Sequence, residues 1–288
     1  MTAAWTPYKI RQHDQHLTMR DKEILSSIEQ FRMLSTRLIQ RLHFPAGAFG
    51  EHLNVPAATR GTTRVLLRLE AHGLIARLPR RIGGIKHGSA GTVWQLAATG
   101  ERYLRAQRDD ADRRRFTAPT TTFMEHTLEV ADIAVALTEQ VRLGVFELLH
   151  LQTEPTCWRE HTGASGAAMT LKPDLFVVTA DSQYEAHCFV EVDRATEHLP
   201  AIVRKCRTYQ AHHQSGVEQT KNGLFPLVVW VAPDQPRADK IRRSIDTTPG
   251  LDPGLFTVTT RADAIRVLSP DPDQTNASPI THSKGGTS

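Results

Sequence analysis

Three carboxylates in the second half of this 288-residue chain stand where simple geometry could bring them together. Asp174 precedes an apolar run, LFVVTA, while Glu191 and Asp193 lie at the end of a second run, FVEVD. An ionised carboxylate is costly away from water unless it is paired or bound to a metal ion, so acids beside buried runs need a reason. Sets of oxygen donors suit Mg²⁺ or Mn²⁺. We therefore expect a divalent-metal site with Asp174, Glu191 and Asp193 as its ligands.

The two apolar runs, 171–179 and 184–193, are expected to pair as a hairpin because a short turn-like stretch joins them. If the hairpin is symmetric about the middle of that stretch, Asp174 lies opposite Glu191. Side chains alternate along a strand, so Glu191 and Asp193 point to the same face. The alternative is that these acids form ion pairs with nearby arginines, namely Arg194, Arg204 or Arg207.

A helix over 197–213, with Thr196 as its N-cap, is expected to follow the second strand. One face of this helix presents five residues: His198, Ile202, Lys205, Tyr209 and His212. At the acidic site, Lys205 could stabilise a phosphorane-like transition state or orient water, and Tyr209 could bind a phosphate or act as a nucleophile. Alternatively, Tyr209 is half-buried packing and Lys205 extends along the surface to water.

The charge of the chain is divided between its two parts. Residues 1–115 contain 20 Lys and Arg against 10 Asp and Glu, whereas the remainder contains 15 against 21. The first part therefore suits a polyanion, and the second suits cations. Three cysteines without a CxxC pair support neither a zinc ribbon nor a disulfide framework. We expect a soluble, cytoplasmic protein, because no secretory signal and no membrane-length apolar window is present.

Residues 17–106 have the element order of a winged helix-turn-helix. Thr18 and Ser35 are N-cap candidates for the first two helices, and Asp21 stands at the capping-box position. The expected elements are helices over 19–31, from Ser35 onward and over 58–72, strands over 74–78 and 92–96, and a helix from Thr99. The alternative is a small helical domain with a solvated basic loop.

Two groups of residues are expected to contact DNA. The third helix would enter the major groove, and its candidates are Arg60, Thr62, Thr63, Arg64 and Arg68. The hairpin tip would contact phosphates through Arg80, Arg81 and Lys86.

The remaining chain divides by composition. Residues 1–16 are expected to form a flexible leader, 107–121 a linker, and 269–288 a disordered tail. In residues 122–268, strands alternate with helices and the strands are nearly continuous apolar runs. This pattern predicts an α/β sheet covered on both faces.

Several motifs resemble those of the replication-relaxation family, which is found on plasmids and integrative elements and is related to MobC-type relaxases. The motifs are KPD at 172–174, FVEVDRATE at 189–197, and Arg204-Lys205 with Tyr209. The resemblance covers about residues 17–245. It implies an α+β or α/β protein in which an N-terminal winged helix-turn-helix is followed by a restriction-endonuclease-like, three-layer PD-(D/E)xK core.

The resemblance implies metal-dependent nicking of double-stranded DNA at an origin of transfer or replication. Asp174 and Glu191 would be the metal ligands, with Asp193 auxiliary. The nuclease pattern has lysine where Asp193 stands, so Lys205 would have to supply it from the helix. Conjugation or replication proteins are further expected partners, and a homodimer is allowed. The other hypothesis is a non-catalytic DNA-binding replication or transcription regulator with a degenerate nuclease core.

Overall fold

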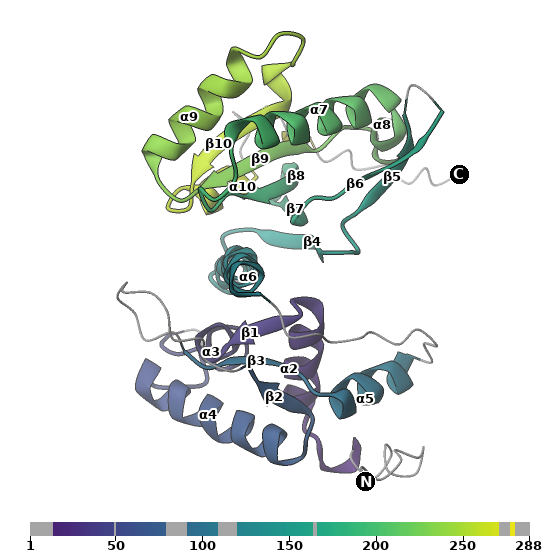
Figure 1. The fold of residues 1–288 in the computed structure, drawn as a ribbon. Coiled ribbons are helices and arrows are strands. Elements are labelled where there is room, and N and C mark those ends of the chain that lie inside the picture. The colour runs from purple at the N-terminus through teal and green to yellow at the C-terminus, as the bar shows by residue number, and fades with distance from the viewer. Residues whose placement is uncertain are drawn as a thin grey trace, which may run out of the picture. The chain divides into compact units, whose positions relative to one another are not determined.

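The computed structural model describes residues 14–48, 50–78, 91–108, 120–163 and 166–270, and the backbone of 277–279. The chain divides into two compact units, Met1–Val135 and Ala136–Ser288 (Figure 1). Most of the expected leader, linker and tail lies outside the described residues, as does the tip of the first hairpin.

Before α6, the described residues of the first unit form helices and a small antiparallel sheet. Its elements are α2 (Met19–Gln30), β1 (Met33–Ser35), α3 (Thr36–His43), α4 (Val55–Ala71), β2 (Ile75–Arg77), β3 (Val93–Leu96) and α5 (Ala98–Arg108). The strand order is β1-β3-β2, with both pairs antiparallel. This order of helices and strands agrees with the sequence prediction except for β1, which was not predicted.

Local capping explains where the helices of the first unit begin. Thr18 and Asp21 form the predicted capping box of α2, and Ser35 caps α3 by accepting from Leu38 N–H at 3.2 Å. Asn54 caps α4, so this helix begins one turn earlier than the sequence predicts. After α4 the chain reverses at Gly73, whose φ of +68° is accessible to glycine at little cost.

Helix α6 (Thr121–Arg142) runs across the division between the units. Its early residues Met124 and Leu128 pack against Met33, Leu78 and Val93 of the first unit. The beginning of this helix therefore belongs with the first unit, whereas the sequence predicts a second domain from residue 122.

The second unit is built on a mixed sheet. Its main strands are β4 (Glu147–Thr153), β7 (Leu175–Ala180), β8 (Tyr184–Val192), β9 (Leu227–Ala232) and β10 (Phe256–Thr260), in the order β10-β9-β8-β7-β4. Strands β4, β7 and β8 are antiparallel neighbours, whereas β8, β9 and β10 are parallel. A short strand, β11 (Ala277–Pro279), pairs with the beginning of β8.

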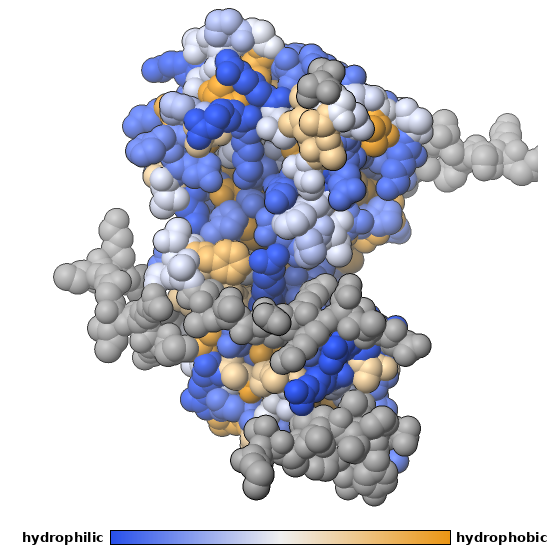
Figure 2. All heavy atoms as spheres, turned by 45° about the vertical axis from the view of Figure 1, so that its right-hand side comes forward, coloured by the Kyte–Doolittle hydropathy of each residue, from blue (hydrophilic) through white to orange (hydrophobic). Residues whose placement is uncertain are grey.

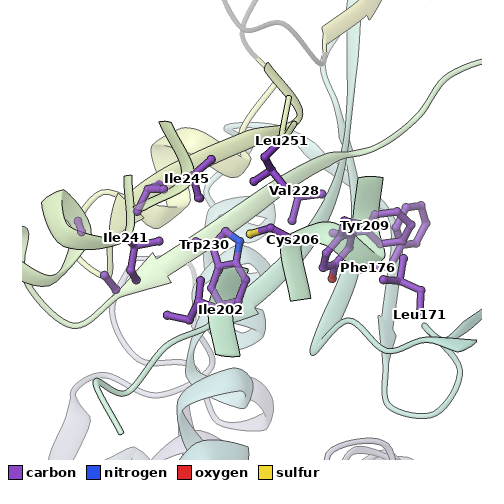
Figure 3. Packing of buried hydrophobic residues seen from close by; sticks show 14 of the residues in the cluster. Leu171, Phe176, Ile202, Cys206, Tyr209, Val228, Trp230, Ile241, Ile245 and Leu251 are labelled. Carbon is purple, nitrogen blue, oxygen red and sulfur yellow. The ribbon is translucent and has the colours of Figure 1, made fainter. Parts of the chain in front are cut away.

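Helices α7 (Leu199–Ser215) and α9 (Gln235–Asp246) cover one face of this sheet (Figure 1). Ile202, Cys206 and Tyr209 of α7 project into the same apolar cluster as Val228 and Trp230 of β9 (Figure 3). Burial of this face supplies most of the driving force for docking the helices. The prediction that Thr196 caps α7 is wrong, because the helix begins after His198, which makes no side-chain cap bond.

The other elements of the second unit are short. They are the hairpin β5 (Arg159–Thr162) and β6 (Ala168–Leu171), α8 (Val217–Asn222), the 3₁₀ turn Pro253–Leu255 and α10 (Ala264–Leu268). The sequence predicts an irregular segment where the β5–β6 hairpin forms.

The protein is therefore a mixed α+β protein. The face drawn in Figure 2 is largely hydrophilic, with apolar residues scattered among the polar ones. Among the described residues, no helix combines the length and apolar character that crossing a membrane requires.

Candidate functional site

Asp174 and Glu191 occupy facing positions at one end of the β7–β8 hairpin. Leu175 pairs with Val190, and Asp174 N–H donates to Val190 C=O at 3.1 Å, so the next rung sets Asp174 opposite Glu191. This is the predicted register. The turn between the strands is held by Asp181. Its carboxylate accepts hydrogen bonds from the backbone N–H groups of Gln183 and Tyr184, at 2.7 and 2.8 Å.

Glu191 is 1 % exposed and is held by two side chains of α7. Lys205 Nζ lies 2.5 Å from Glu191 Oε2, and Tyr209 OH donates to Glu191 Oε1 at 2.5 Å. Lys205 Nζ also lies 5.7 Å from the centre of the Trp230 ring, which is next to Glu191 across the β8–β9 pair. The predicted approach of α7 to the acidic strand is confirmed for both Lys205 and Tyr209.

The second carboxylate is fixed by the backbone. Asp174 is 6 % exposed, and its Oδ2 accepts from Val192 N–H at 2.7 Å. Asp174 therefore has a fixed orientation, in a position where its charge acts on Glu191.

Burial dominates the electrostatics of this site. It raises the pKa of Glu191 to about 8, with Asp174 adding to the rise while Lys205 and Tyr209 oppose it. Burial acts to lower the pKa of Lys205, but Glu191 and Asp174 outweigh it and raise that pKa above its ordinary value. Lys205 therefore stays cationic beside Glu191.

Tyr209 is a buried donor. The side chain is fully buried in the apolar cluster of α7 (Figure 3). Burial, and then the proximity of Glu191, raise the pKa of Tyr209 well above its ordinary range. The interpretation of Tyr209 as half-buried packing therefore understates its burial, and its hydroxyl is directed at Glu191.

Asp193 is held differently from the other two carboxylates. Arg237 of α9 forms a bidentate pair with it, with Nε to Oδ2 at 2.7 Å and Nη2 to Oδ1 at 3.0 Å. Ion pairing of this acid was one expected alternative. The arginine that forms the pair is Arg237, however, and not one of the three arginines that the sequence suggested. Within the described ranges, no group of three His, Cys, Asp or Glu side chains is arranged to hold a metal ion. Asp174 and Glu191 are the two carboxylates that the hairpin brings together.

The candidate DNA contacts on α4 differ in their surroundings. Arg60, Thr63 and Arg64 are exposed. Thr62 is fully buried and its hydroxyl donates to Ala58 C=O at 2.8 Å, so its assignment as a groove contact is wrong. Arg68 is held by the buried carboxylate of Asp21, at 2.5 and 2.7 Å. The candidates at the hairpin tip, Arg80, Arg81 and Lys86, lie outside the described residues.

A second buried polar cluster was not predicted as a unit. His212 of α7 contacts His161 of β5, with ring centroids 4.6 Å apart, and its Nε2 lies 3.2 Å from Glu218 of α8. Glu218 also lies 3.2 Å from Arg159 Nε. His212 is on the predicted inner face of α7, but the hairpin that carries its partners was predicted to be irregular.

Comparison with known proteins places the chain in a family. The model of the replication-relaxation family matches residues 25–228, which is more than half of the chain. No curated protein and no solved structure matches it. The matched region includes α4, the β7–β8 hairpin and α7 with Lys205 and Tyr209. The chain belongs to the replication-relaxation family.

Proposed function

We propose that this protein binds double-stranded DNA of a plasmid or mobile element and acts there as a metal-dependent nickase at an origin of transfer or replication. The observation that carries the proposal is the convergence of Asp174, Glu191 and Lys205 at one end of the β7–β8 hairpin. Two carboxylates and a lysine are the charged groups that a PD-(D/E)xK site needs, and here the lysine comes from α7 in place of the strand position taken by Asp193.

The element order supports the same proposal. In the second unit, three antiparallel strands lead through α7 into the parallel strand β9, and helices cover the sheet. This arrangement supports the proposal of a restriction-endonuclease-like core. In the first unit, the order α2-β1-α3-α4-β2-β3 and the strand order β1-β3-β2 support the proposal of a winged helix-turn-helix. Its exposed Arg60 and Arg64 then face a DNA groove.

The donor chemistry fits Mg²⁺ or Mn²⁺. Asp174 and Glu191 offer hard carboxylate oxygens at a buried position, where burial, and to a smaller extent the charge of Asp174, raise the pKa of Glu191. These two residues would hold the ion. A divalent ion bound there would polarise a phosphate oxygen and lower the pKa of bound water.

The chain's own residues have separable roles in this proposal. Lys205 remains cationic, its side chain is 34 % exposed, and it can meet the negative charge that develops on a scissile phosphate. Tyr209 orients the Glu191 carboxylate from within the core and does not attack DNA. Val192 N–H orients Asp174.

The second candidate function is non-catalytic DNA binding. Both Glu191 oxygens already accept from α7, and Asp193 is engaged by Arg237. A decayed core in which lysine neutralises the glutamate would have these same contacts. In that case the acidic cluster holds the fold together, and the protein regulates replication or transcription by binding DNA.

Nicking of supercoiled plasmid tests the proposal. With Mg²⁺ or Mn²⁺, the protein should convert a plasmid carrying its cognate origin to open circles. Asp174→Ala and Glu191→Gln should abolish this, while Arg243→Gln, at an exposed position of α9, should not. Open circles formed equally by both site variants would remove the assignment. Calorimetric titration with Mn²⁺ separates the two functions: absence of heat that depends on Asp174 and Glu191 favours the non-catalytic protein.

A further inference from the structure

The connection between β8 and α7 determines whether Lys205 and Tyr209 can reach Glu191. Glu191 lies near the end of β8, whereas both partners lie on α7, and residues 193–198 join the two elements. We propose that Arg237 is a positioning residue that fixes this connection and so holds Lys205 and Tyr209 against Glu191. The inference rests on the proposed function of that site, because it assigns Arg237 a role in shaping it.

Arg237 contacts the connection at both of its ends. Besides the bidentate pair with Asp193, its Nη2 donates to Glu197 C=O at 2.6 Å. The guanidinium therefore links Asp193, directly after β8, to Glu197, directly before the N-cap of α7. Its side chain is 13 % exposed, so little water competes for these bonds.

Two features indicate that residues 193–198 must be held in place by contacts from outside this segment. Ala195 has a φ of +56°, a left-handed conformation that a residue with a Cβ rarely adopts unless neighbouring contacts hold it. Its N–H donates to Asp193 Oδ2 at 3.1 Å, the same oxygen that Arg237 Nε contacts. In addition, the N-cap residue of α7, His198, makes no side-chain cap bond, so no side chain of its own holds the start of the helix.

Arg237 is itself well anchored. It lies in the first turn of α9, and its backbone N–H donates to the N-cap carboxylate of Asp234 at 2.8 Å. Helix α9 packs on α7 and β9 within the apolar cluster. The clamp therefore ties the β8–α7 connection to a rigid part of the sheet. A lysine at position 237 could supply the positive charge, but it lacks the planar set of N–H donors with which Arg237 binds Asp193 and Glu197.

Hydrogen exchange measured by mass spectrometry on the full chain tests the inference without metal or DNA. In Arg237→Gln, the amides of residues 194–205 should exchange at least about tenfold faster, because removing one partner of a buried charge pair opens the segment it holds. Amides of the β4–β7 pair should be unchanged. Arg237→Lys should be intermediate, and the control Arg243→Gln should match the wild type.

A second variant removes the charge of Asp193, the partner of Arg237 in the same ion pair. Asp193→Asn should accelerate exchange in the same residues, and the double variant should add little, because the two residues act as one unit. Unchanged exchange over 194–205 in both single variants would overturn the inference. Uniform acceleration throughout the second unit would also overturn it, because Arg237 would then serve general stability.

Kinetics separate this inference from the proposed function. If the wild type nicks DNA, Arg237→Gln should lower kcat at least about tenfold and leave KM for DNA unchanged, as expected when a catalytic group is mispositioned. A rise in KM alone would contradict the positioning role. A wild type that does not nick would defeat the proposed function, while the exchange result would still decide whether Arg237 clamps the connection.

Discussion

Tyr209 combines complete burial with a short hydrogen bond to a carboxylate. Its hydroxyl donates to Glu191 at 2.5 Å, and burial together with Glu191 raises its pKa far above neutral. A phenol in this position is a poor nucleophile, because its proton is held and its oxygen is closed to solvent. We infer that its role at the site is to orient Glu191.

Replacing the hydroxyl tests this role. Tyr209→Phe keeps the ring in the apolar cluster and removes one donor to a buried carboxylate, so the free energy of unfolding should fall by about 1.5–3 kcal/mol. Urea denaturation of the full chain measures this change. Nicking should persist at a reduced rate. A covalent protein–DNA adduct that forms with the wild type and disappears in Tyr209→Phe would contradict the assignment.

At the residue scale, sequence reasoning succeeded where symmetry determined position. A hairpin with a central turn sets Asp174 opposite Glu191 whatever surrounds it, and the observed register agrees. The partner of Asp193 could not be found in this way, because Arg237 lies on a helix that follows another strand. The error at Thr62 was one of helical phase: Ala58, Leu66 and Leu69 define the buried stripe, and residue 62 lies one turn from 58 and 66.

At the element scale, the β5–β6 hairpin is the part that local sequence indicated least. Its strands are four residues long each, and the gap between them is glycine-rich. Short strands carry little alternation, so their pairing depends on the helix on which they pack. Here His161 of β5 lies against His212 of α7, which places an imidazole in a buried position with neither ring nitrogen hydrogen-bonded.

The buried His161 should make stability depend on pH. Burial, and then His212, lower the pKa of His161 below its ordinary value of 6.5. Between these two pKa values the unfolded chain binds more protons, so the stabilisation is present above about pH 6.5 and is lost as the pH falls through the folded pKa. Urea denaturation at about pH 7.5 and about pH 5.5 should show a smaller loss on acidification for His161→Phe than for the wild type.

The surroundings of His161 define the control. Arg159, His212 and Glu218 are the charged or titratable groups of the same cluster, and all three remain in His161→Phe. His150, an exposed residue of β4, offers a matched substitution, and His150→Phe should leave the pH dependence unchanged. An equal loss of stability on acidification in wild type and His161→Phe would show that another group is responsible.

At the scale of the whole molecule, the chain joins a basic unit to an acidic one. Most of the longer helices and strands in each were predictable, because hydrophobic periodicity and caps are local signals, whereas the short β1, β5, β6 and α8 were not. The residue at which the two units divide could not be predicted. Helix α6 is continuous from Thr121 to Arg142, and nothing in its periodicity tells which turns pack with which unit. The first turns of α6 belong to the first unit because Met124 and Leu128 pack against its buried residues. Such contacts depend on tertiary packing, which the sequence of the helix alone does not reveal.

If the first unit binds DNA and the second binds the metal ion, as we propose, DNA binding and metal binding can be separated by mutation. The variant Arg60→Ala/Arg64→Ala should bind DNA more weakly, by about 1–3 kcal/mol for each lost base contact, or with a salt dependence reduced by about one unit for each lost phosphate contact. It should bind Mn²⁺ like the wild type. Asp174→Ala should show the opposite behaviour, because it removes a carboxylate of the acidic site and leaves α4 unchanged.

Fluorescence anisotropy with labelled duplex, at several salt concentrations and without divalent ions, measures the first property, and calorimetric titration with Mn²⁺ measures the second. Arg243→Gln serves as the control for loss of an exposed positive charge in the acidic unit, and it should alter neither. Loss of DNA binding in Asp174→Ala would show that the acidic site itself holds DNA. Loss of Mn²⁺ binding in the α4 variant would show that the two activities depend on one shared surface, because exposed arginines do not ligate metal ions.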